Sequence, residues 1–204
     1  MNENQLQYNC ARAAKTGDLF ANASVVRLNR NSDGGVPIFG TSARLCYDDE
    51  YLYVEMVALD DGFTATMTQY NDRLYTEDVV EIFIDEDCDG KSYIELEVNP
   101  LNALLHYVIR NDLHGTFWAY ARIEKNVQTE VELSRRDSCC EWKVLMKIPL
   151  TEFKNSTPKA GDIWAFNLYR IKYFENRPPE YSSFSPTHTD NYHIPQYFAA
   201  LQFV

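Results

Sequence analysis

The segment Val79–Val98, VVEIFIDEDCDGKSYIELEV, decides the fold of this 204-residue chain. Apolar and polar residues alternate in both of its halves, which predicts two β-strands because successive side chains of a strand point to opposite faces. The run DEDCDG between the halves is rich in Asp and Gly and predicts the turn of a hairpin. If the two strands pair, Glu81, Glu95 and Glu97 share one face of the sheet, opposite the apolar residues.

The rest of the chain repeats this pattern of short strands and turns. ARLCYDDEYLYVEMVAL (43–59) predicts a second hairpin, and further strands are expected at 104–109, 118–123, 127–133, 142–149, 163–171 and 198–204. No window shows a sustained helical stripe. The predicted fold is therefore all-β: one domain over residues 1–204, an antiparallel, jelly-roll-like β-sandwich. Residues 1–20 are expected to form a loosely held N-terminal arm, and the Pro-, Ser- and Thr-rich segment 175–195 a long late loop.

The composition excludes several classes of protein. With 45% hydrophobic and 24% charged residues the chain is not intrinsically disordered. Its 19 Lys and Arg against 30 Asp and Glu give a net charge of −11, which repels phosphate backbones and anionic lipid surfaces. We therefore expect neither nucleic acid nor a membrane as a partner, and a neutral ligand or a cation fits the charge better.

The cysteines and the N-terminus bear on the compartment. The five cysteines are odd in number and no two have CxxC spacing, which favours free thiols over a disulfide framework or a zinc site. The first residues lack the apolar stretch of a signal peptide, and no window approaches a membrane span. As written, the sequence predicts a cytoplasmic protein.

Two clusters of potential metal ligands stand out. Asp85, Asp87 and Asp89 are spaced like the start of an EF-hand, but the twelfth position, which needs Glu, is Leu96. The turn is therefore either a loose calcium site or a solvated acidic turn. The late-loop segment 188–193 holds two His and one Asp that could bind zinc, although a plain loop role is favoured because no third His accompanies them.

The order and spacing of several segments resemble the family 9 carbohydrate-binding modules. The matching text is ARLCYDDEYLYVEM (43–56), YNDRLYTEDVVEIFIDEDCDGKSYIELEVNPLN (70–102), EWKVLMKIPL (141–150), GDIWAFNLYRI (161–171) and SSFSPTHTDNYHIPQYFAALQF (182–203). The resemblance implies a β-sandwich that binds an oligo- or polysaccharide, often at the reducing end of a glycan. It also implies association with glycoside hydrolases such as xylanases, a role in polysaccharide catabolism, structural calcium and secretion. Secretion disagrees with the missing signal peptide, so the compartment stays open.

The resemblance also suggests site residues. Tyr75 stands where family members place an aromatic side chain that stacks on the sugar, and Phe184 in SSFSPT stands for the second aromatic. Glu81 matches the glutamate that hydrogen-bonds sugar hydroxyls, and Glu97 lies near a position that contributes a polar ligand. We expect the two rings to flank one concave surface with Glu81 between them.

Two further side chains could form hydrogen bonds with the hydroxyl groups of a bound sugar. Asn167 and Arg170 are side chains that can hydrogen-bond the edge of a sugar ring, while aromatic rings cover its apolar C–H face. Each residue also has a plain structural interpretation: an exposed tyrosine for Tyr75, a salt bridge for Arg170, a packed loop anchor for Phe184. The glutamates could likewise form an ordinary solvated face.

Three functions follow from this reading, of which we favour the first. It is a non-catalytic carbohydrate-binding module that uses aromatic stacking and carboxylate or amide hydrogen bonds. The second is a glycoside hydrolase with Glu81 and either Glu95 or Glu97 as the carboxylate pair, which needs the carboxyl groups about 5–9.5 Å apart. The third is a sandwich that only makes contacts with other proteins.

Overall fold

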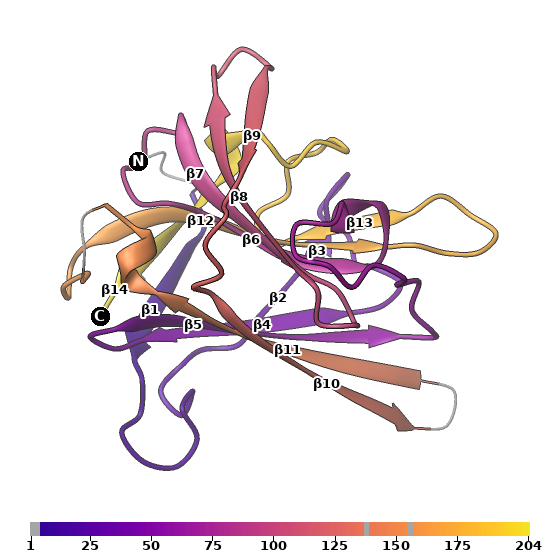
Figure 1. Cartoon of the computed structure of the whole chain (residues 1–204), viewed down its shortest axis with the longest axis horizontal. Helices are drawn as coiled ribbons and strands as arrows, with labels where there is room; N and C mark the ends of the chain where they lie inside the picture. The colour runs from indigo at the N-terminus through magenta and orange to yellow at the C-terminus, as the bar shows by residue number, and fades with distance from the viewer. Residues whose placement is uncertain (1–4, 137–138, 155–156) are drawn as a thin grey trace.

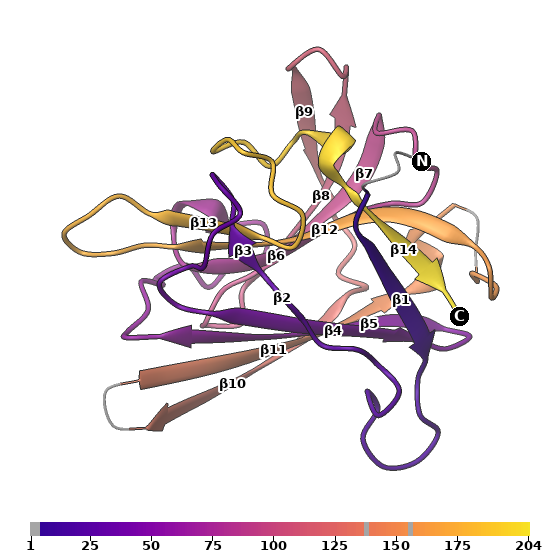
Figure 2. The same ribbon diagram turned by 180° about the vertical axis from the view of Figure 1, so that it is seen from behind.

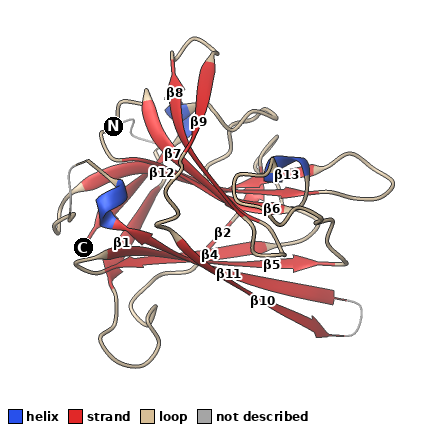
Figure 3. Cartoon of the chain, viewed as in Figure 1, coloured by secondary structure: helices blue, strands red, loops and turns tan. Residues whose placement is uncertain are grey.

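The computed structural model describes residues 5–136, 139–154 and 157–204. Strands make up almost all of its regular structure (Figure 3), as the alternation predicts. No helix in these ranges is long and apolar enough to cross a membrane. The strands are β1 (Gln7–Arg12), β2 (Val26–Arg27), β3 (Asn29–Arg30), β4 (Thr41–Tyr47), β5 (Tyr51–Asp60), β6 (Val79–Asp85), β7 (Ser92–Val98), β8 (Leu104–Asn111), β9 (Phe117–Ala121), β10 (Gln128–Arg136), β11 (Cys139–Pro149), β12 (Ile163–Lys172), β13 (Glu180–Ser183) and β14 (Ala199–Phe203). Short 3₁₀ turns lie at η1 (Leu74–Thr76), η2 (Leu150–Glu152) and η3 (Pro195–Tyr197).

The strands form two facing layers (Figure 1). Sheet A has the order β14-β12-β6-β7-β8-β9, and sheet B has the order β10-β11-β5-β4. The β4–β5 and β6–β7 hairpins are both confirmed. In the second of these, Glu81 pairs with Glu97 and Ile82 with Leu96, so the register keeps the acidic and the apolar residues on opposite faces.

Strand β1 joins the two sheets (Figure 2). Its first half pairs in parallel with β14 and its last two residues pair in parallel with β4. The sandwich is therefore mixed, and the prediction of purely antiparallel sheets is wrong at this point. The loosely held arm is also corrected for residues 7–12, because the Tyr8 and Cys10 side chains are buried and the Tyr8 hydroxyl donates a 2.8 Å hydrogen bond to the Ser24 carbonyl.

The predicted late loop is partly a strand. β13 pairs with the second half of β12, on the edge whose first half pairs with β14. The part that remains a loop, residues 184–194 between β13 and η3, is called the late loop below. Because β13 and β14 share one edge of sheet A, this loop begins and ends beside the same strand.

Strands β6, β7 and β12 of sheet A are buried on both faces. The inner face of the sheet packs on sheet B and forms the main core with side chains such as Ile82, Leu96, Met56, Trp142 and Phe166. Its outer face carries a second apolar cluster, which includes Val79, Phe83, Tyr93, Leu105, Tyr169, Ile171, Tyr192 and Phe198. Loops from both ends of the sheet cover this outer face, so polar groups placed there are also shielded from water.

A buried ion network ties β12 to the end of β5. Asp60 accepts a hydrogen bond from the Arg170 guanidinium at 2.8 Å and forms an ion pair with the Lys172 ammonium at 2.6 Å. The Lys172 ammonium also lies 3.3 Å from Asp78, just before β6. All four side chains are almost completely buried. Paired charges of opposite sign are tolerated in such a place, whereas an unpaired one is strongly destabilising.

We expect the substitution Asp60→Asn to lower the free energy of unfolding by about 3–5 kcal/mol, because it leaves Arg170 and Lys172 short of their shared counter-ion. Asp61→Asn is the matched control: Asp61 is half exposed and lies 3.5 Å from the Lys172 ammonium, so a change within about 0.5 kcal/mol is expected. Urea unfolding of both variants measures the difference. Equal stability of the two variants would show that the network does not hold the sheets together.

Candidate functional site

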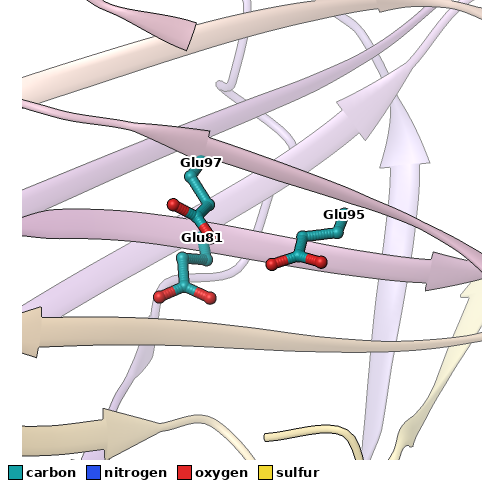
Figure 4. A group of neighbouring side chains, drawn as sticks. All are labelled: Glu81, Glu95 and Glu97. Carbon is teal, nitrogen blue, oxygen red and sulfur yellow. The ribbon is translucent and has the colours of Figure 1, made fainter. Parts of the chain in front are cut away.

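Three glutamates meet on the outer face of sheet A. Glu81 lies on β6, and Glu95 and Glu97 lie on β7; alternation turns all three side chains away from the core. Their carboxylates lie beside one another (Figure 4), with one oxygen of each within 4.8 Å of the others. All three residues are buried. The sequence pattern therefore predicts the shared face correctly, but a solvated polar surface is wrong.

These carboxylates form the floor of a cavity of about 360 Å³. Its walls are mainly aromatic and come from six different parts of the chain. The aromatic lining consists of Tyr75 on η1, Phe83 on β6, Tyr107 on β8, Phe117 on β9, Tyr181 on β13, and Tyr192 and His193 in the late loop. The bottom of the cavity is therefore formed by acidic side chains of the sheet. Its sides are formed by aromatic side chains from loops and neighbouring strands.

The wall that carries Tyr75 is held by two acidic residues of the β5–β6 loop (61–78). The Asp78 carboxylate accepts hydrogen bonds from the backbone amides of Thr64 at 2.8 Å and Tyr173 at 2.5 Å. The Glu77 carboxylate accepts the Thr66 hydroxyl and the Thr66 amide. The loop is therefore folded back on itself, which places Tyr75 at the mouth of the cavity with 38% of its surface exposed.

The late loop is anchored by the buried side chain of Asn31. Its oxygen accepts the Ser183 hydroxyl at 2.7 Å and the Thr187 amide at 2.8 Å, and its nitrogen donates to the Thr187 hydroxyl at 2.7 Å. Further along the loop, the Tyr192 ring stacks on Tyr169 of β12 with 4.0 Å between ring centroids. These contacts hold the loop over the outer face of sheet A.

The His193 ring closes one side of the cavity. It stacks on Phe117 with 3.6 Å between centroids, and its Nδ1 lies 3.0 Å from the Tyr93 hydroxyl. Burial lowers the pKa of His193 to about 4, so the ring is uncharged at neutral pH. None of the described residues that line the cavity is Lys or Arg. The acidic floor has no positive group facing it.

Burial raises the pKa of all three glutamates. Burial raises the pKa of Glu95 to about 7. The pKa of Glu81 lies well above the usual range, first because of burial and then because of repulsion by Glu95. For Glu97, burial and the repulsion of both neighbours raise the pKa, while the nearby Tyr75 backbone acts in the opposite direction. The cluster therefore retains protons at pH values where exposed glutamates have lost them.

Half of the predicted site residues lie together. Tyr75, Glu81 and Glu97 all line the cavity. Asn167 lies on the outer face of sheet A, but its amide is occupied by the Ser185 backbone: it donates to the carbonyl at 2.8 Å and accepts the amide at 2.9 Å. It fastens the start of the late loop and does not line the cavity.

Arg170 and Phe184 point to the other side of the sheet. Arg170 belongs to the buried ion network, which agrees with its structural interpretation. Phe184 packs in the core against Phe166, with 5.7 Å between ring centroids, because the chain leaving β13 turns this side chain inward. The expectation of Tyr75 and Phe184 as an aromatic pair around Glu81 is therefore wrong.

The acidic turn after β6 carries the three predicted calcium ligands, and calcium binding there stays a prediction. The Asp85 carboxylate accepts the amides of Asp87 at 3.2 Å and Gly90 at 2.7 Å, and Asp87 pairs with Lys154 at 2.9 Å. Asp89 accepts the Lys91 amide at 2.7 Å. These carboxylates thus serve the turn itself. Within the described ranges, the His, Cys, Asp and Glu side chains close enough to share a metal ion are the three glutamates.

Sequence reasoning missed several walls of the cavity. Tyr107 and Phe117 follow from alternation in β8 and β9 once the strand order is known, since both strands belong to the sheet that carries the glutamates. Tyr181 and His193 carry no such signal, because the path of the late loop alone brings them there. The alternation places Glu95 on the same face as Glu81 and Glu97, but the family resemblance gives it no role in sugar binding.

A family profile and several solved structures resemble this chain over nearly its whole length. The sequence profile of the carbohydrate family 9 binding domain-like family matches residues 14–203. A candidate carbohydrate-binding protein of Bacteroides uniformis superposes with a TM-score of 0.79 at 17% identity, and the match covers 98% of this chain and 100% of that one. Among curated proteins none matches the sequence.

A family 9 carbohydrate-binding module of Caldicellulosiruptor kristjanssonii is also similar, in two complexes. The complex with cellotriose has a TM-score of 0.70 at 17% identity and covers 97% of this chain and 93% of that one. The complex with glucose has a TM-score of 0.68 at 18% identity, with 97% and 95% covered. At these identities the likeness establishes the sandwich fold.

The raised pKa values make stability depend on pH. Between pH 4.5 and about 7 the folded protein holds protons that the unfolded chain has released, so the cluster makes the fold less stable as the pH rises through this window. We expect Glu97→Gln, which removes one of the charges, to stabilise the protein at pH 8 relative to pH 5, by on the order of 1–3 kcal/mol. Denaturant unfolding at both pH values measures this, with the exposed Glu132→Gln as control. An equal effect of Glu97→Gln at both pH values would contradict it.

Proposed function

The chain belongs to the carbohydrate family 9 binding domain-like family, and we propose that its binding site is the cavity on the outer face of sheet A. The ligand is an oligo- or polysaccharide, of which the cavity accepts one end. The hollow is partly open to solvent and has a volume of about 360 Å³, so we infer that a terminal sugar residue enters it while the rest of the glycan lies outside.

The combination of aromatic walls with an acidic floor carries this proposal. Sugars have apolar C–H faces, which aromatic rings cover, and hydroxyl edges, which carboxylates bind as hydrogen-bond acceptors. Tyr75 stands at the mouth with its ring accessible, and Glu81 and Glu97 lie below it. Binding sites of this kind are mostly apolar hollows with a few converging polar groups.

The domain is a non-catalytic binding module, as its family membership indicates. Hydrolysis of a glycosidic bond needs one protonated and one ionised carboxyl group in defined positions. Here burial raises the pKa of all three glutamates, so none keeps the ordinary pKa that would set it apart as the ionised partner. The carboxylates are better suited to contact a ligand than to cleave it.

The ligands of the structural neighbours suggest where to begin. The Caldicellulosiruptor kristjanssonii module is found with glucose and with cellotriose, so β-linked glucose oligosaccharides are the first class to test. An association with a glycoside hydrolase such as a xylanase, a role in polysaccharide catabolism and a structural calcium ion stay predictions of the family resemblance. A melting curve in excess chelator tests the last of these, since a bound ion stabilises the folded state.

We expect Tyr75→Ala to weaken saccharide binding roughly 5- to 30-fold. This corresponds to about 1–2 kcal/mol, from an apolar contact of roughly 40–80 Å² at about 25 cal/mol per Å². Titration calorimetry against a panel of cello- and xylo-oligosaccharides measures the effect. Tyr120→Ala is the matched control, because Tyr120 is 57% exposed on β9 but does not line the cavity.

Three results would count against the proposal. Equal weakening by the Tyr75 and Tyr120 variants would place the site elsewhere on the surface. Release of reducing ends from any glycan of the panel would contradict a purely binding role. A wild-type protein that binds no member of a broad glycan array would contradict carbohydrate recognition itself.

A further inference from the structure

The cavity floor gathers acidic groups that no positive group of the lining faces. Glu81, Glu95 and Glu97 converge there, and Asp190 lies in the lining as a fourth acid. The described lining contains no Lys or Arg, and its one His is the uncharged His193. A neutral sugar would bring no positive group to these acids.

Several carboxylate oxygens of these glutamates also lack a hydrogen-bond partner. Both carboxylate oxygens of Glu97 and one of Glu81 are buried with no partner in hydrogen-bonding geometry. A buried polar atom without a partner is rare and calls for an explanation, such as a water molecule, an ion or a ligand. The contrast with Asp60 is clear, because its carboxylate binds both Arg170 and Lys172. The glutamates therefore do not stabilise the fold in the way that the ion network does.

We propose that the cavity selects a sugar that carries a protonated amino group, that is, an amino sugar with a free amine. Its ammonium group binds at Glu81, Glu95 and Glu97, and its pyranose ring lies against the aromatic walls. This inference rests on the proposed function and names the substrate class of the same site.

An ammonium group fits the floor better than a divalent metal ion. It has three hydrogens to donate, and three carboxylates converge on one point. Calcium takes six to eight oxygen ligands, but apart from these acids, Asp190 and Asn191 the lining is aromatic or aliphatic. Aromatic faces instead attract organic cations.

Binding of the amine also has a proton signature. The acids that face the ligand release their protons at higher pH than exposed glutamates do, since burial raises the pKa of Glu95 to about 7 and raises that of Glu81 and Glu97 well above the usual range. An ammonium group favours their ionised form, so protons leave the cluster on binding. His193 contributes none, because it is already uncharged.

The test compares sugars that differ only at the amine. Glucosamine and its β-1,4-linked disaccharide are titrated calorimetrically at pH 6.5 beside N-acetylglucosamine, glucose and cellobiose. We expect at least 10-fold tighter binding of the amines, with a heat that changes between buffers of different ionisation enthalpy. Glu97→Gln should reduce this preference to under 3-fold, whereas Glu132→Gln, on the exposed face of β10, should leave it unchanged.

The outcomes separate this inference from the proposed function. Binding of glucose or cellobiose as tight as that of the amines overturns the inference and leaves the carbohydrate site intact. Absence of binding by every sugar overturns both. Tight binding of calcium or magnesium alone, lost in Glu97→Gln and competing with the amine, shows a metal site and overturns the inference as well.

Discussion

The burial of strands β6, β7 and β12 of sheet A on both faces is the constraint on which the rest of this structure depends. Sheet B covers one face, and the β5–β6 loop and the late loop cover the other. A sheet with one solvated face would leave Glu81, Glu95 and Glu97 in water, where their charges would be harmless and their oxygens hydrated. With both faces covered, each polar side chain of the sheet must find a partner, lose its charge or meet a ligand.

The protein uses two of these solutions on opposite faces of the same sheet. On the inner face, Arg170 and Lys172 are matched by Asp60 at the end of β5 in sheet B, so this ion network links the two sheets. On the outer face, the glutamates are matched by nothing positive, and burial shifts their pKa upward instead. Residues retained in such a destabilising arrangement mark a functional site more convincingly than satisfied ones do.

Much of the floor of the site could be predicted from sequence, because the two-residue period and the short turn of β6–β7 fix the register. The same two-residue period also predicts the direction of Arg170. This residue lies on the same face of β12 as Trp164, Phe166 and Leu168, and so points into the core. Its charge argued for a site residue, but the buried acid that compensates it lies far away in sequence, on β5, and no local pattern reveals it.

The walls could not be predicted in the same way. Phe184 follows β13, and its amide donates to the Leu168 carbonyl at 2.9 Å, which continues the strand pairing by one residue and turns the ring inward onto Phe166. Its neighbourhood in the sequence, with Pro and Ser, suggested an accessible loop. The direction of a side chain in such a loop depends on contacts that only the folded chain brings together.

Asn31 illustrates how the walls depend on distant residues. Its side chain holds Ser183 and Thr187 although more than 150 residues separate them from it in the chain, and it has no contact with the cavity. Yet the segment that it fixes carries Tyr192 and His193, which form one side of the hollow. The floor is therefore determined by local alternation on rigid strands, while the shape that selects a ligand is determined by loop anchors. Two sandwiches with the same strands can share the fold at 17–18% identity and still present different walls to a sugar.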